Sequence, residues 1–355
     1  MIWWGRDMEY FKLRILLIFL LIAEINGEPI VPALCFFGDS VMDAGNNNHL
    51  TTLLRANFLP YGRDFIDHKP TGRFCNGKLA ADYTAEFLGF ETYPPPYLSR
   101  IDNESLLLTG ANFASAGSGY YDETALIYQA LSLRRQLSHY KDWQNRVVAM
   151  VGGEKAKEIF ATGIHILSAG SSDFLQNYDI NPVLNRIYSP PQFSDILITS
   201  YITFVEGLYD VGVRRFGVIS LPPIGCLPAA ITLLNLGSND CMEDLNDEAL
   251  MFNNKLNETS KNLVVRFPDL KIVVFDIYHT LLKMIKYPGA RGFCESRKGC
   301  CGTGTVETSL LCNEVSVGTC PNATGFVFWD GFHTSDAANE LLAQSLLTQG
   351  IPLIS

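Results

Sequence analysis

The chain has 355 residues, of which 47% are hydrophobic and 12% aromatic, and its formal net charge at pH 7 is -10. This composition is sufficient for a large buried core and argues against a disordered chain. The acidic balance, with no run of more than two Lys or Arg residues, argues against nucleic acid and anionic membrane surfaces as main partners.

The first 27 residues have the pattern of a secretory signal peptide. Arg6, Lys12 and Arg14 precede an apolar run at 15–23, and Gly27 provides a small residue for cleavage. A membrane anchor is the weaker interpretation, because the run is shorter than the roughly 20 residues that span a bilayer. We therefore predict a signal peptide at 1–27 and a single secreted domain at 28–355.

The remaining chain alternates between short apolar runs and longer stretches with helical spacing. The apolar, partly β-branched runs that predict buried strands are 32–38, 111–114, 164–169, 216–221 and 271–277. The spacing of apolar residues predicts helices over 199–215, 245–267 and 335–349, the last with Ser335 or Thr334 as its N-cap. Strands that alternate with helices indicate a parallel sheet covered on both sides. No internal repeat or Pro/Gly/Ser-rich linker divides the chain, which favours one domain.

The nine cysteines indicate disulfide bonds. Five of them lie close together near the end of the chain, at Cys294, Cys300, Cys301, Cys312 and Cys320. A zinc site is the competing interpretation, but the paired Cys-x-x-Cys ligands of structural zinc sites are missing. After a signal peptide, disulfides are expected. We interpret Cys35 as the unpaired ninth cysteine; the pairing of the other eight stays open, with a local Cys226–Cys241 bridge as one option.

Three sequons for N-linked glycosylation fit the same secretory compartment. Each has the form Asn-x-Ser or Asn-x-Thr, and they begin at Asn103, Asn257 and Asn322. We predict that these asparagines carry glycans.

Two segments far apart in the sequence supply the side chains of nucleophilic acyl transfer. Ser40 ends the motif Gly-Asp-Ser directly after the first predicted strand, where ligands of parallel sheets gather. Asp330 precedes His333 by three residues, in a glycine-containing turn ahead of the last predicted helix. A serine needs an imidazole to take its proton, and the imidazole needs an acid to fix its tautomer. We therefore predict Ser40, Asp330 and His333 as a catalytic triad.

Five motifs in a fixed order give the chain a family resemblance. They are FGDSVMDAGNN at 37–47, PTGRFCNG at 70–77, GANFASAGSG at 110–119, LPPIGC at 221–226, and CCG at 300–302 followed by FWD at 328–330. With them, the chain after Gly27 resembles the plant GDSL-type esterase/lipases of the SGNH hydrolase superfamily over nearly its whole length. The resemblance implies a flavodoxin-like three-layer α/β/α fold with a mostly parallel sheet, and it assigns the same triad.

The resemblance also implies an oxyanion hole. Its donors would be the backbone N–H of Ser40, a glycine of the motif at 110–119, for which we choose Gly117 over Gly119, and the Asn side chain of a Gly-x-Asn-Asp motif that the family has where this chain reads AGSSD at 169–173. Here Ser172 replaces that Asn. We expect weaker yet real activity with the Ser172 hydroxyl as substitute donor, because removing one donor typically costs about 100- to 1000-fold in rate. Thr334 stands where proline is usual, which we expect to loosen the placement of His333.

From these features we predict a secreted serine esterase or lipase that hydrolyses carboxylic esters through an acyl-enzyme on Ser40. The expected location is extracellular, in the apoplast or cell wall, without integral membrane association after signal cleavage. We expect small or medium esters as substrates and no metal or organic cofactor. Two alternatives stay open: an acyltransferase acting on cell-wall polymers or cutin precursors, and a weakly active secreted binding protein, suggested by Ser172 and Thr334.

Overall fold

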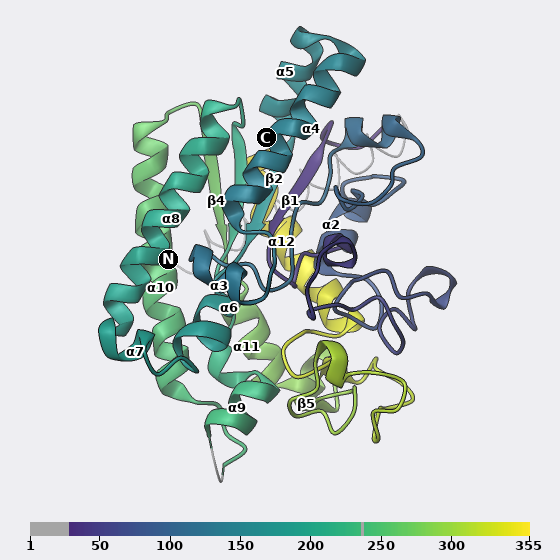
Figure 1. The fold of residues 1–355 in the computed structure, drawn as a ribbon, viewed down its shortest axis with the longest axis vertical. Helices are drawn as coiled ribbons and strands as arrows, with labels where there is room; N and C mark the ends of the chain where they lie inside the picture. Colours follow the sequence, from purple (N-terminus) through teal and green to yellow (C-terminus); the bar gives the residue numbers. More distant parts are fainter. Residues whose placement is uncertain (1–27, 236–237) are drawn as a thin grey trace, which may run out of the picture.

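Four parallel strands form the centre of the protein, in the order β1-β2-β3-β4 (Figure 1). The computed structural model describes residues 28–235 and 238–355, so the predicted signal peptide lies outside the described residues. The strands are β1 (Leu34–Gly38), β2 (Ile164–Ser168), β3 (Arg215–Ile219) and β4 (Lys271–Phe275). A second, two-stranded sheet pairs β5 (Glu295–Gly299) with β6 (Phe326–Phe328).

The segment 111–114, predicted as a strand, pairs with the free edge of β1 at a single bridge between Phe36 and Asn112. Phe36 N donates to Ala111 O at 3.2 Å, and Phe113 N donates to Phe36 O at 2.8 Å. With this segment counted as the second strand along the chain, the spatial order is 2-1-3-4-5, which is the flavodoxin-like order. The predicted fold class is therefore confirmed.

Helices cover both faces of the sheet (Figure 1). The helices are α2 (Ala80–Phe87), α3 (Asp122–Ile127), α4 (Leu133–Val151), α5 (Gly153–Thr162), α6 (Ser171–Asp173), α7 (Leu184–Ile187), α8 (Pro190–Asp210), α9 (Pro228–Leu234), α10 (Glu243–Arg266), α11 (Tyr278–Lys286) and α12 (Asp336–Ile354). On one face, the ring of Phe37 packs against Tyr140 of α4 and Phe204 of α8, at 5.6 and 5.3 Å between ring centres. On the other face, Ile164 and Ile166 line a small apolar cavity with residues of α2 and α12. Among the described residues, none of the helices has the length and apolar character needed to cross a membrane.

The three predicted helices are present, with boundaries set by their caps. α8 begins nine residues earlier than predicted, because Ser189 and Gln192 form a capping box and Pro190 occupies the first position of the helix. α10 lies within two residues of its predicted bounds, whereas α12 continues five residues beyond its predicted end and α8 ends five residues before its own. Ser335 caps α12 by accepting a hydrogen bond from Ala338 N at 3.2 Å, which selects it over the alternative N-cap.

Six of the nine cysteines form disulfides, as Cys226–Cys241, Cys300–Cys320 and Cys301–Cys312. The prediction of disulfides and of the first bridge is confirmed. The expectation that Cys35 alone is unpaired is wrong, since Cys75 and Cys294 are also free. Their thiols donate to the backbone carbonyls of Thr334 and Gly325 instead, and neither has another free thiol as partner.

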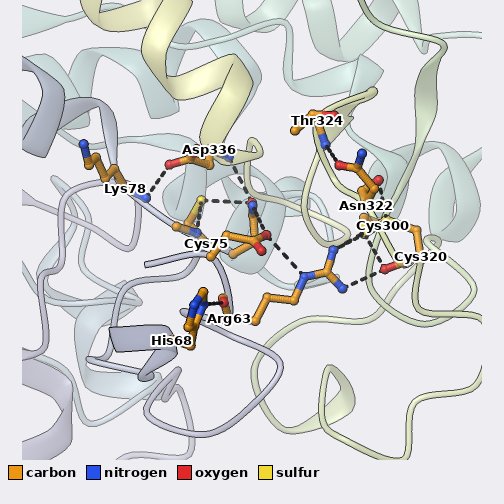
Figure 2. A network of polar contacts seen from close by, with 12 residues as sticks. Arg63, His68, Cys75, Lys78, Cys300, Cys320, Asn322, Thr324 and Asp336 are labelled. Carbon is orange, nitrogen blue, oxygen red and sulfur yellow. Dashed lines mark hydrogen bonds and ion pairs between the residues drawn. A yellow bond between two sulfur atoms is a disulfide. The ribbon is translucent and has the colours of Figure 1, made fainter. Parts of the chain in front are cut away.

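Figure 2 shows how the N-terminal part of the chain is tied to the segments on either side of residue 333. Arg63 Nη1 donates to Cys320 O at 2.6 Å, and its Nη2 lies 3.4 Å from Cys300 Sγ. Asp336, the first residue of α12, accepts from Lys78 N at 2.6 Å. These contacts fix both the disulfide-linked loop and the start of α12, and so fix the turn that lies between them.

Candidate active site

Ser40 lies in a tight turn directly after β1, at the carboxyl edge of the sheet. Gly38 has φ of +123°, and a Cβ there would lie 1.7 Å from Ser168 O, so only glycine fits. Gln136 of α4 holds this turn from the side. Its Oε1 accepts from Gly38 N at 2.8 Å and its Nε2 donates to Gly38 O at 2.9 Å. The backbone leading to Ser40 is therefore fixed before any substrate binds.

Asp330 and His333 lie in a turn that follows β6. Trp329 N donates to His333 O at 2.8 Å, which closes the turn. Oδ1 of Asp330 accepts from the backbone N–H groups of Phe332 and His333, at 2.9 and 2.8 Å. The carboxylate is thus held by its own loop and faces the imidazole.

Thr334 is firmly bound in the same region. Its hydroxyl donates to Asn339 Oδ1 at 2.5 Å, and its backbone forms a bridge with Phe328. Its carbonyl accepts from the thiol of Cys75 at 3.5 Å. These contacts argue against the predicted loosening of His333.

The structure brings Ser40, Asp330 and His333 into direct contact. His333 Nε2 lies 2.7 Å from Ser40 Oγ, and Nδ1 lies 2.8 and 2.9 Å from the two carboxylate oxygens of Asp330. Asp330 is 0% exposed, whereas Ser40 and His333 retain 8% and 7% exposure. With the ring proton on Nδ1, directed at the carboxylate, the Nε2 lone pair can accept the Ser40 proton.

The GDSL-like lipase/acylhydrolase family profile matches residues 34–346. The chain belongs to this family. Among its relatives in Arabidopsis thaliana, it is 62% identical to GDSL esterase/lipase At5g03820 over 93% of this chain and 94% of that protein. It is 54% identical to GDSL esterase/lipase At5g22810 over 100% and 99%, and 52% identical to GDSL esterase/lipase APG over 98% and 99%. The resemblance drawn from the sequence motifs is confirmed.

Two hydroxyl groups that the sequence did not single out support Asp330 in this GDSL family member. Tyr61 and Thr308 donate to Asp330 Oδ2 at 2.8 and 3.1 Å. Burial, followed by the nearby charge of Asp330, raises the pKa of Tyr61 well above its usual range, so it stays a neutral donor. Its oxygen also accepts from Ser309 N at 2.8 Å. Both residues come from irregular segments, where no periodicity or motif marks them.

A small cavity of about 40 Å³ opens beside the triad, lined in part by Ser40, Ser172, Gln176, Phe332 and His333. Among the described residues, the backbone N–H of Ser40 has no hydrogen-bond acceptor. The hydroxyl of Ser172 likewise has no partner there, although the residue is only 3% exposed. Two donors are therefore free to point at an oxygen bound in the cavity.

The two glycines considered for the oxyanion hole have packing roles. Gly117 has φ of +84°, and a Cβ there would lie 2.7 Å from Leu54 and 2.9 Å from Tyr128. It is not among the residues that line the cavity. Gly119 packs against Asp173, whose carboxylate oxygen would lie 2.1 Å from a Cβ. The assignment of Gly117 as an oxyanion donor stays a prediction.

Two partly buried carboxyl groups lie near the segment that follows Ser172. Asp179 comes directly after the π-helical turn Phe174–Tyr178, and Glu248 belongs to α10. One oxygen of each has no hydrogen-bond partner within the described residues. Burial and then the charge of Glu248 raise the pKa of Asp179 to about 8, and burial and then the charge of Asp244 raise the pKa of Glu248 to about 7.

We expect the melting temperature to fall by about 4 °C or more as the pH rises from about 5 to about 8. A carboxyl group whose pKa is raised by folding binds its proton more tightly in the folded state. The unfolded chain loses its proton first, so the free energy of unfolding decreases between the two pKa values. Burial raises the pKa values of Asp39, Asp43 and Asp173 to about 7, 6 and 7, which acts in the same direction. Circular dichroism melts across this range measure the effect.

The variant Asp179→Asn tests whether Asp179 contributes to this pH dependence of the melting temperature. It removes one of the titrating groups, so its melting temperature should fall less over the same pH range than that of the unmodified protein. A melting temperature that rises with pH in the unmodified protein would contradict the assignment of these raised pKa values.

Proposed function

We propose that the protein is a secreted serine esterase that hydrolyses carboxylic esters through an acyl-enzyme on Ser40. Membership of the GDSL-like lipase/acylhydrolase family classes the chain as a carboxylic-ester hydrolase. The observation that carries the covalent mechanism is the continuous contact from Ser40 Oγ through His333 to the buried Asp330, with distances of 2.7 and 2.8 Å.

In the proposed reaction, His333 Nε2 takes the proton of Ser40 as Oγ attacks the ester carbonyl carbon. Asp330 stabilises the imidazolium that results. The carbonyl oxygen becomes an oxyanion that accepts from Ser40 N–H and from the Ser172 hydroxyl. The imidazolium returns its proton to the leaving alcohol, which gives the acyl-enzyme. His333 then deprotonates a water, which attacks the acyl carbon, and the released Ser40 oxygen regains a proton.

We expect small or medium acyl groups, because the cavity of about 40 Å³ has room for little more than the reacting carbonyl group, and a long chain would lie exposed on the surface. Ser40 is the nucleophile of the first step, water is the nucleophile of the second, and His333 transfers the protons in both.

Secretion and glycosylation are part of the same proposal. Three disulfides are typical of proteins that fold in an oxidising compartment. The three sequon asparagines, Asn103, Asn257 and Asn322, are all exposed, which a glycan acceptor requires. Together with the signal-like residues 1–27, these features support an extracellular location, in the apoplast or cell wall.

A panel of p-nitrophenyl esters of increasing acyl length tests the proposal, together with labelling by an alkyl phosphonate. We expect hydrolysis that is fastest for short and medium chains, and a phosphonate adduct on the peptide that contains Ser40. A protein that binds esters without turnover and does not react with the phosphonate would support the binding-protein alternative. Ester products formed with added glycerol, in place of the free acid, would support the acyltransferase.

A further inference from the structure

The side chain of Gln176 in the active-site cavity makes no hydrogen bond to the residues that the structure describes. It lines the same cavity as Ser40 and His333. Its Oε1 is buried without a hydrogen-bond partner among the described residues. Leaving a buried polar group unpaired typically costs about 1–3 kcal/mol, so such a group in a native protein calls for an explanation.

Gln176 lies about one helical turn after Ser172. The helix α6, which contains Ser172, continues directly into the π-helical turn Phe174–Tyr178, which contains Gln176. Residues four positions apart on a helix lie on the same face, and both of these line the cavity. Single π-helical turns occur frequently at functional sites.

The residues that follow Ser172 and Gln176 are both anchored to Thr124. Asp173 accepts from the Thr124 hydroxyl at 2.7 Å, and Asn177 Nδ2 donates to the same oxygen at 3.0 Å. The backbone carbonyl of Gln176 in turn accepts from a tyrosine hydroxyl at 2.9 Å. The backbone on which both side chains stand is thus fixed, which is the condition for a preorganised oxyanion donor.

We propose that Gln176 is a catalytic residue whose side-chain N–H donates to the oxyanion. It would supply the amide donor that the family places at position 172, where this chain has the shorter Ser172. Rotation about χ3 reorients a carboxamide, so the side chain of Gln176 can direct its N–H at an oxyanion bound in the cavity. The inference rests on the acyl-enzyme mechanism proposed above and adds a third donor to Ser40 N–H and the Ser172 hydroxyl.

The variant Gln176→Met tests this role, because methionine has a similar length but no N–H. We expect kcat for p-nitrophenyl acetate to fall on the order of 10- to 100-fold with KM changed by less than about threefold, since the donor acts on the transition state. Gln344→Met, the same change at an exposed position on α12, should leave both constants unchanged. Gln176→Glu, which keeps the shape and removes the N–H when ionised, should lose activity as well.

An asparagine introduced at position 172, where the family has one, distinguishes a catalytic role of Gln176 from a role in packing. The double variant Ser172→Asn/Gln176→Met should recover most of the kcat that Gln176→Met loses, because the introduced asparagine side chain would again provide the amide donor. If Gln176→Met retains the full kcat, Ser172 acts without Gln176 and the inference is overturned. A loss that Ser172→Asn does not restore would overturn it too, by assigning Gln176 a purely structural role. Ser40→Ala, measured in parallel, tests the acyl-enzyme mechanism itself. If Ser40→Ala retains activity, that mechanism is wrong, whatever the result for Gln176→Met.

Discussion

Replacing Ser40 with alanine is expected to lower kcat by about 10⁴- to 10⁶-fold while the protein stays folded. The change removes only the hydroxyl oxygen that contacts His333. The turn itself is held through the backbone of Gly38 by Gln136, so its geometry does not depend on the serine side chain. Initial rates with p-nitrophenyl acetate measure kcat, and a melting curve confirms folding. Ser200→Ala is a matched control, because within the described residues the Ser200 hydroxyl hydrogen-bonds only to a carbonyl of its own helix, at 3.4 Å.

A double variant tests whether Ser40 and His333 act together. If Ser40 and His333 act as one unit, Ser40→Ala/His333→Ala should be no slower than Ser40→Ala, because the imidazole has no proton to take once the hydroxyl is gone. Additive losses would mean that His333 activates a different nucleophile, such as water. A Ser40→Ala variant that keeps its activity would remove the acyl-enzyme from the mechanism.

The strands β1, β2 and β3 could be predicted because nearly all of their residues are buried, which gives each a short apolar run. β4 keeps such a run although it is only partly buried, whereas β5 is largely polar and was not predicted. The run at 111–114 forms only isolated bridges, from Asn112 to Phe36 of β1 on one side and to Pro96 on the other. Helix starts were harder to predict. The capping box of Ser189 and Gln192 marks the start of α8, whereas the predicted start lay inside the apolar periodicity, which already begins at Phe193.

The triad could be predicted because its parts lie in two short segments with typical chemistry. The spacing Asp-x-x-His is not sufficient by itself. Asp276 and His279 share it and also form a contact, at 2.7 Å, but their side chains are 52% and 61% exposed. What distinguishes His333 is its position at the carboxyl edge of the sheet, next to Ser40. The supporting contacts of Gln136, 98 residues from Gly38, and Tyr61, 269 residues from Asp330, have no signal in the sequence.

Replacing Asp330 with asparagine is expected to lower kcat by about 10⁴-fold with little loss of stability. The backbone N–H groups of Phe332 and His333 point at Oδ1, so the amide oxygen of asparagine must take that position. The amide nitrogen then takes the Oδ2 position, where one of its two N–H groups can donate to the hydroxyl of Thr308, while Tyr61 loses its acceptor. The variant therefore keeps most of its local hydrogen bonds and should fold.

The loss of activity in Asp330→Asn comes from its effect on the imidazole of His333. Nδ1 of His333 lies 2.9 Å from the Oδ2 position, so the new amide would donate to Nδ1 and favour the tautomer that carries its proton on Nε2. Nε2–H faces Ser40 Oγ and cannot take its proton. The negative charge that stabilises the imidazolium is lost as well. Asp276→Asn makes the same change in the exposed Asp-x-x-His pair and should leave kcat unaltered. Equal effects of the two substitutions, or a rate for Asp330→Asn within about tenfold of the unmodified enzyme, would show that Asp330 does not orient the base.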